Sequence, residues 1–360
     1  MANKDYQRLI RNITNRNNPE AILLEKSFAD ELGQLGYKYA LEYVKRSMQG
    51  VDPAYTEKTK EAGNKVKDQL IEQLGNLNFR FQGSVMTNTH IVGYSDIDLV
   101  VFANQFYSYD VSGMKKIIEE APTYVPPKYT ATQITKLKTV VESDNYKGDD
   151  LADLKKIRND SEIKLVAVYK TVDITKAKSI PVELTNPKRK VDVVTANWYH
   201  SSEYVLQDND IYKGVQIYDK DKHAKLKADF PFLSIERINS KDKDVNGRLK
   251  KMIRFLKTVK AESGVDLKLS SFTINAICYD IPTANYITKD YIELVIVIYT
   301  QFKKILDDAS YRFNLKSVDG MEFVFRKEDQ VTEDKDKLEE IKVIQKELIL
   351  IISDINEEVK

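Results

Sequence analysis

The pattern of apolar and polar positions predicts helices near both ends of the chain and strands between them. Apolar residues recur at helical spacing in residues 56–74, and Gly75 is suited to end that helix. Similar apolar stripes predict helices over residues 244–264, 289–307 and 335–357. No internal repeat and no low-complexity linker interrupts the chain, so we expect packed lobes.

The middle of the chain has the short apolar runs that are typical of strands. These runs are rich in Val, Ile and aromatic residues, and they cover residues 78–84, 96–102, 162–170, 179–185 and 189–200. Between them, residues 104–129 are expected to be irregular because they contain Gly113 and three prolines, and the polar stretch 142–160 is expected to hold a short helix.

This order of elements predicts an α+β fold in which helices back one face of a sheet. We expect two regions. Residues 1–200 would hold N-terminal helices and the sheet, and residues 201–360 would form a mainly helical lobe.

Composition adds little that is specific. The 360 residues carry a net charge of only +1, which gives no sign of strong nucleic-acid or membrane binding. The single cysteine, Cys278, can form neither an internal disulfide nor a cysteine-rich zinc site. No secretion signal is evident, and the apolar run 291–302 is too short to span a membrane, so a cytoplasmic location is expected.

Two aspartates at the start of an apolar strand are the main chemical signal. Asp96 and Asp98 flank Ile97, so in a strand both carboxylates point to the same face. Like charges held side by side repel each other, and a divalent cation between them is the simplest compensation. The sequence therefore predicts a metal site here.

A third carboxylate is expected from another strand. Asp192 lies among Val191, Val193 and Val194, where a buried aspartate without a partner would be unfavourable. Asp173 is a competing candidate, but it lacks the continuous apolar frame.

Gly83 and Ser84, an eleven-residue spacer and then Asp96 and Asp98 together resemble the signature of the polymerase-beta-like nucleotidyltransferase superfamily. The resemblance implies that Gly83 and Ser84 bind a nucleoside triphosphate. It also implies that Asp96, Asp98 and Asp192 are catalytic and hold two Mg²⁺ ions, or Mn²⁺ in their place.

The second half more closely resembles the cGAS/DncV-like nucleotidyltransferases, the bacterial relatives of cyclic GMP-AMP synthase. The similarity lies in "GRLKKMIRFLKTVK" and "LKLSSFTINAI", and it implies that Lys257 and Ser271 reach the triphosphate. Phe272 departs from the tyrosine that is common in the family. The simpler alternatives are a solvated helix lysine for Lys257 and a helix N-cap for Ser271.

This resemblance implies an enzyme that joins ribonucleoside triphosphates, such as ATP, GTP or another nucleotide, into a cyclic oligonucleotide and releases pyrophosphate. The product would act as a second messenger that switches on an effector in anti-phage (CBASS-type) defence. Alternatives are a linear oligonucleotide product, transfer to an RNA, protein or small molecule, and a non-enzymatic binding module. The bases, the linkage and the product size stay open.

Other features carry less weight. His90, His200 and His223 lack the spacing of a metal site, and the chain has no P-loop motif. Trp198 and Tyr199 follow Asp192 closely, so they are placed either to stack on a base or to pack in the core.

Overall fold

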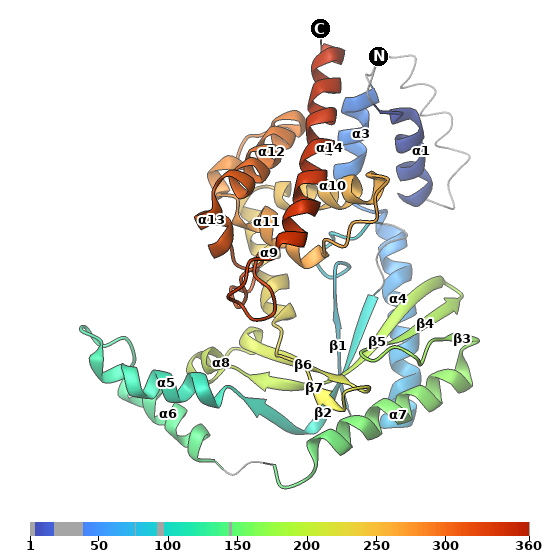
Figure 1. Cartoon of the computed structure of the whole chain (residues 1–360). Coiled ribbons are helices and arrows are strands. Elements are labelled where there is room, and N and C mark those ends of the chain that lie inside the picture. Colours follow the sequence, from blue (N-terminus) through green and yellow to red (C-terminus); the bar gives the residue numbers. More distant parts are fainter. Residues whose placement is uncertain (1–3, 18–38, 76, 92–96, 144–145, 360) are drawn as a thin grey trace. The chain divides into compact units, whose positions relative to one another are not determined.

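The structure, a computed structural model, describes residues 4–17, 39–75, 77–91, 97–143 and 146–359. Contacts divide the chain into two units: a helical unit of residues 1–56, 84–95 and 234–360, and a sheet unit of residues 57–83 and 96–233. Figure 1 shows the elements of both units.

The sheet unit is built on a mixed sheet whose central pair is β2 and β5. Its main path runs β1-β2-β5-β4-β3, and β6 and β7 continue from β5. β2 and β5 are parallel, whereas their other neighbours pair antiparallel. The strands are β1 (Asn78–Gln82), β2 (Ile97–Tyr109), β3 (Thr171–Val172), β4 (Ile180–Thr185), β5 (Lys188–His200), β6 (Lys213–Asp219) and β7 (Ala224–Lys225).

Two helices cover one face of this sheet. α4 (Pro53–Leu74) approaches β1 and β2 so closely that a Cβ at Gly63 would lie 3.4 Å from the Ile97 side chain. α7 (Asp150–Val168) lies beside α4, because Lys164 pairs with Glu72 at 2.9 Å. Since side chains alternate along a strand, Asp98 points to the face opposite Ile97.

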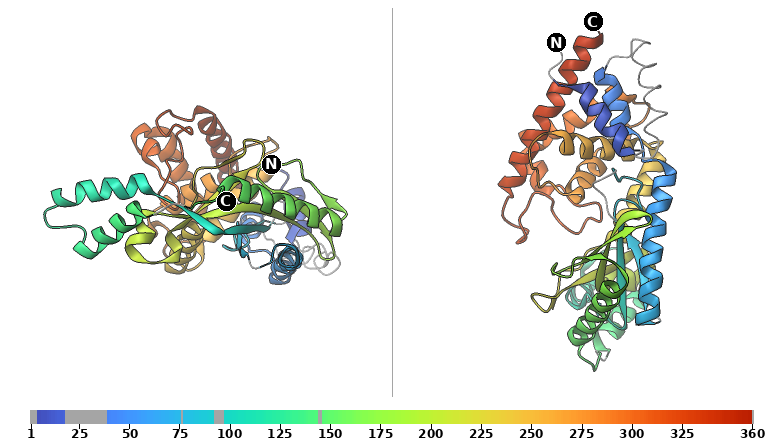
Figure 2. Two further views of the ribbon diagram at one scale, coloured as in Figure 1. Left: turned by 90° about the horizontal axis from the view of Figure 1, so that it is seen from below. Right: turned by 90° about the vertical axis from the view of Figure 1, so that its right-hand side faces the viewer.

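The remaining helices of the sheet unit form an arm beyond the ends of β2 and β5. Its members are α5 (Val111–Glu120), η1 (Ala121–Thr123), α6 (Ala131–Glu142), α8 (Ser202–Gln207) and η2 (Asp210–Tyr212). α5 and α6 run as a hairpin away from the sheet, as Figure 1 and the left view of Figure 2 show. Met114, Leu137 and Leu206 form the small core of the arm.

The helical unit has a single large core around α10, and most of the α10 side chains are buried. Its helices are α1 (Tyr6–Asn17), α3 (Tyr39–Met48), α9 (Pro231–Asp244), α10 (Arg248–Glu262), α11 (Ser271–Asp280), η3 (Thr283–Asn285), α12 (Tyr291–Asp307), α13 (Ala309–Asn314) and α14 (Lys335–Val359). No helix among the described residues is both long and apolar enough to cross a membrane.

The division differs from the boundary near residue 200 that we expected. α1 and α3 supply core residues such as Tyr43 and Met48 to the cluster that surrounds α10, so residues 1–56 belong to the helical unit. Residues 201–233 stay with the sheet because β6 pairs with β5.

Three local predictions were wrong. Residues 162–170 are not a strand, because Asp149 caps α7 and the helix continues unbroken to Val168. Residues 104–129 are largely regular: β2 runs to Tyr109 and α5 follows it. The chain after residue 200 returns to the sheet through β6 and β7 before it becomes helical.

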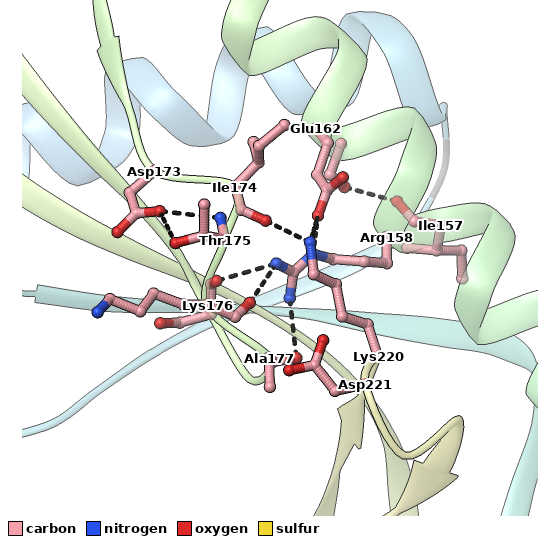
Figure 3. Close-up of polar contacts among 12 residues, drawn as sticks. Ile157, Arg158, Glu162, Asp173, Ile174, Thr175, Lys176, Ala177, Lys220 and Asp221 are labelled. Carbon is pink, nitrogen blue, oxygen red and sulfur yellow. Dashed lines mark hydrogen bonds and ion pairs between the residues drawn. The ribbon is translucent and has the colours of Figure 1, made fainter.

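A buried arginine ties α7 to the loop between β3 and β4 (Figure 3). The Arg158 guanidinium donates to Glu162 at 2.7 Å and to the carbonyl oxygens of Lys176 at 2.8 Å, Ser179 at 3.0 Å and Ala177 at 3.4 Å. A planar group with five donors suits such a convergence of acceptors, and an ammonium group could not reproduce it.

Lys220, after β6, closes the same network. Its ammonium group donates to Glu162 at 3.0 Å and to the carbonyl of Ile174, and its backbone N–H donates to Ala177 at 3.0 Å. The start of β4 is therefore fixed from two sides.

We predict that Arg158→Met lowers the free energy of unfolding by about 3 kcal/mol, because Glu162 and three carbonyls lose a buried partner. Lys156→Met is the matched control, since Lys156 forms an i,i+4 pair with Asp160 on the same helix at an exposed position. The control is expected to unfold at the wild-type urea concentration. Equal effects of the two substitutions in urea denaturation would contradict this account.

Candidate active site

Two of the predicted carboxylates are neighbours in the sheet unit. Asp98 on β2 and Asp192 on β5 are direct partners in the parallel register, and neighbouring strands lie about 4.8 Å apart. Both residues are partly exposed, although their strands are otherwise largely buried. The third carboxylate, Asp96, lies outside the described residues.

Gly83 lies directly against this pair. β1 ends at Gln82, the register partner of Asp98, and Gly83 follows with a φ of +89°. A Cβ at Gly83 would lie 2.5 Å from Oδ2 of Asp98, so any side chain at this position would displace the Asp98 carboxylate. The glycine is therefore required both by its backbone conformation and by the space that Asp98 occupies.

Asp173 is not part of this arrangement. It lies at the edge of the sheet, separated from β2 by β4 and β5. Its carboxylate accepts hydrogen bonds from the hydroxyl of Thr175 at 2.6 Å and from its N–H at 2.8 Å, and these bonds lower the pKa of Asp173. Asp173 thus has the environment of a loop aspartate.

The donor set fits a hard divalent cation. Two carboxylates held side by side on one face present the oxygen ligands that Mg²⁺ and Mn²⁺ prefer. Within the described residues no group of three or more His, Cys, Asp or Glu side chains is placed to hold a metal ion, so a complete set would need Asp96 as well.

Ser84 begins a short turn that belongs to the helical unit. Its carbonyl accepts from the N–H of Thr89 at 3.0 Å and from the hydroxyl of Thr87 at 3.2 Å. Val85, Thr87 and Thr89 are buried, which fixes the turn.

Lys257 holds the end of this turn. Its side chain is buried, and its ammonium group donates to the carbonyl of Thr89 at 3.0 Å. Burial, together with a smaller effect of the Arg254 charge, lowers the pKa of Lys257 to about 8. The alternative of a solvated helix lysine is therefore wrong.

Lys257 and Ser271 line the same pocket, whose volume is about 310 Å³ and whose wall also includes Lys260. Ser270, not Ser271, is the N-cap of α11, since its hydroxyl accepts from the N–H of Thr273 at 3.1 Å. Ser271 occupies the first turn of that helix, where backbone N–H groups lack helical partners and favour anions.

Sequence reasoning missed Arg254. This residue is buried one turn before Lys257, and it donates to the carbonyls of Asn88 at 2.7 Å and of Met48 at 3.0 Å. The sequence did offer one sign of it: Arg254 lies three residues before Lys257 on an apolar helix, so the two side chains lie on the same side of the helix.

Trp198, His90 and His223 pack against, or form hydrogen bonds with, other residues of the protein. Trp198 stacks on Phe102 with ring centroids 3.8 Å apart, so it packs in the core of the sheet unit. His90 is buried and lies 3.2 Å from the Thr56 hydroxyl, and His223 contacts the Tyr218 hydroxyl at 2.7 Å.

Comparison with known proteins identifies the chain. Residues 236–345 match the model of the cGAS/DncV-like nucleotidyltransferase C-terminal helical domain. The chain is 40% identical to a c-di-GMP synthase of a Flavobacteriaceae species, with 98% of both chains covered, and 41% identical to a c-di-GMP synthase of Capnocytophaga granulosa, with 99% of both covered. A solved structure of a STING-associated CdnE c-di-GMP synthase from Flavobacteriaceae aligns with a TM-score of 0.85, at 39% identity and 99% coverage of both chains.

The chain is therefore a nucleotidyltransferase with a polymerase-beta-like fold, as the sequence predicted. It belongs to the cGAS/DncV-like nucleotidyltransferase family, and it joins nucleoside triphosphates into a cyclic oligonucleotide. The family depends on divalent metal ions.

We predict that Gly83→Ala lowers kcat/KM by about 100-fold, because the added methyl group displaces Asp98. Gly75→Ala is the matched control: Gly75 also has a positive φ, of +68°, but nothing lies within 4 Å of its Cβ position. Both variants are expected to lose about 1 kcal/mol of stability from backbone strain. A similar loss of activity in both variants, measured by pyrophosphate release, would refute the steric explanation.

Proposed function

We propose that this enzyme makes cyclic di-GMP from two molecules of GTP. The observation that carries the proposal is full-length identity of about 40% to proteins named c-di-GMP synthases. The ribose hydroxyl of one GTP would attack the α-phosphorus of the other, and pyrophosphate would leave. A second attack within the linear intermediate would close the ring.

In this proposal Asp96, Asp98 and Asp192 hold two Mg²⁺ ions. The register of Asp98 and Asp192 supports the assignment, because it places two carboxylates on one face of neighbouring strands. When bound, the ions supply positive charge to the attacking hydroxyl and to the leaving pyrophosphate.

Ser84, Lys257 and Ser271 would bind the triphosphate. The buried Lys257 ammonium group is already fixed by the carbonyl of Thr89, so little side-chain entropy is lost on binding an anion. Gly83 would let the backbone approach the phosphates, since no side chain fits there.

The product would switch on an effector in anti-phage defence. Likeness to the STING-associated relative supports a STING-type receptor as that effector.

Asp192→Asn is expected to reduce kcat by more than about 1000-fold while the protein stays folded, because one carboxylate of the metal site is lost. Asp173→Asn is the control, because it makes the same chemical change in a loop of the same sheet unit. Pyrophosphate release with Mg²⁺ and GTP measures both. Activity in the Asp192 variant near the wild-type level would remove Asp192 from the site.

The product itself is tested with the four ribonucleoside triphosphates, each labelled in turn at the α-phosphate, in the presence of Mg²⁺. We expect label from GTP alone to enter a phosphatase-resistant species that co-migrates with cyclic di-GMP. Label from ATP, CTP or UTP in the resistant product would contradict the assignment of GTP. A product that phosphatase fully degrades would instead contradict cyclisation.

A further inference from the structure

The sheet unit contains a second pocket, of about 670 Å³, among α6, α8 and the ends of β2 and β5. Tyr109, His200 and Tyr204 form its aromatic side, and Thr135 and Thr139 of α6 lie on its wall. Tyr109 and His200 are register partners at the ends of the two strands that carry Asp98 and Asp192 near their starts. The pocket is therefore remote from the carboxylates.

His200 is the polar side chain of this pocket that is best placed to bind a ligand. Its side chain is only 8% exposed, and in the described part of the chain its imidazole makes no hydrogen bond. Three rings pack around the imidazole: Tyr107 stacks on it with ring centroids 4.6 Å apart, and the rings of Tyr109 and Tyr204 lie at 5.2 and 4.4 Å. Neither ring nitrogen is among the sealed, unpartnered polar atoms of the described residues, so the edge of the imidazole is accessible to a ligand that enters the pocket.

The imidazole offers both a donor and an acceptor. Burial and, to a smaller extent, the nearby charge of Lys213 lower the pKa of His200 to about 4, against an opposing effect of Asp210. At neutral pH the ring is therefore uncharged, with one nitrogen donating and the other accepting.

The remainder of the wall is weakly polar. The hydroxyls of Thr135 and Thr139 donate to the carbonyls of Ala131 and Thr135 within α6, both at 3.0 Å, so they offer no donor to a ligand. The charged residues of the lining are Lys136 and Asp208, which are opposite in sign. Such a wall does not favour a polyphosphate, whereas aromatic sides favour a flat ring.

We propose that this pocket binds an uncharged planar nitrogen heterocycle, whose ring contacts Tyr109 and Tyr204 and whose polar edge forms hydrogen bonds with the His200 imidazole. The site is separate from the one that joins nucleotides, and it does not depend on which nucleotide is joined.

The test uses two probes of similar size: benzimidazole, which has a donor and an acceptor, and indane, which has neither. Titration of the full chain is followed by ligand-observed NMR. We expect benzimidazole to bind and indane to bind at least tenfold more weakly, because a hydrogen bond of about 1.4 kcal/mol corresponds to a factor of ten. His200→Phe, which keeps an aromatic ring, is expected to abolish this difference.

A second pair of variants tests the pocket even if His200→Phe does not fold. Thr135→Trp fills the pocket from an exposed position of α6 and is expected to abolish benzimidazole binding, whereas Lys138→Trp introduces the same side chain at an exposed position of that helix outside the pocket and is expected to leave binding unchanged. Equal binding of the two probes, no binding of benzimidazole, or binding that survives Thr135→Trp would overturn the proposal.

Titrations with adenosine and ATP separate a free heterocycle from a nucleotide. The charge of the lining predicts that adenosine binding is sensitive to Thr135→Trp and that ATP binding is not. The proposal would also be overturned if ATP binding were lost in Thr135→Trp but kept in Lys138→Trp. That result would mean that the pocket binds a polyphosphate.

Discussion

The side-by-side placement of two carboxylates is the constraint around which the sheet unit is organised. Asp98 and Asp192 are direct partners on parallel strands. Their backbones are therefore no farther apart than the spacing between neighbouring strands. A protein that holds like charges this close gives up stability for function, which is common at active sites. In the proposed metal site, a divalent cation would offset the repulsion between the two carboxylates.

Several features of the chain keep the pair in place. The apolar side chains that alternate with the two aspartates face α4 and α7, so that a shift of one residue would bury the carboxylates. Arg158 and Lys220 fix the loop before β4, whose Pro181 is the register partner of Asp192. Gly83 leaves room for Asp98 on the other side.

The helical unit contains two buried cations that are held by backbone carbonyls. Lys257 and Arg254 are buried cations on one helix, and each is satisfied by backbone carbonyls of the turn that follows Gly83. Hydrogen bonds of this kind are strong because one partner is charged and the surroundings are dry. In the proposed function, Lys257 held in this way would be preorganised for an anionic substrate, without an excess of basic residues in the chain as a whole.

Much of this could be predicted from the sequence, for identifiable reasons. The helices over residues 289–307 and 335–357 have apolar stripes that match their buried faces, and the frame of valines around Asp192 marked a strand. The segment 162–170 could not be assigned correctly, because its apolar residues suit a strand and only the distant N-cap Asp149 decides for a helix. The contacts of Arg158 and Arg254 depend on carbonyls far along the chain, so the local sequence does not show which partners these two side chains bind.

The most direct measurement is the melting temperature of the wild-type protein and of Asp98→Asn as a function of Mn²⁺ concentration. The account predicts that Mn²⁺ raises the melting temperature of the wild type, since a ligand that binds only the folded state stabilises it, and that the variant responds much less. An equal response of the two proteins, or no response of the wild type, would contradict a cation site at these carboxylates.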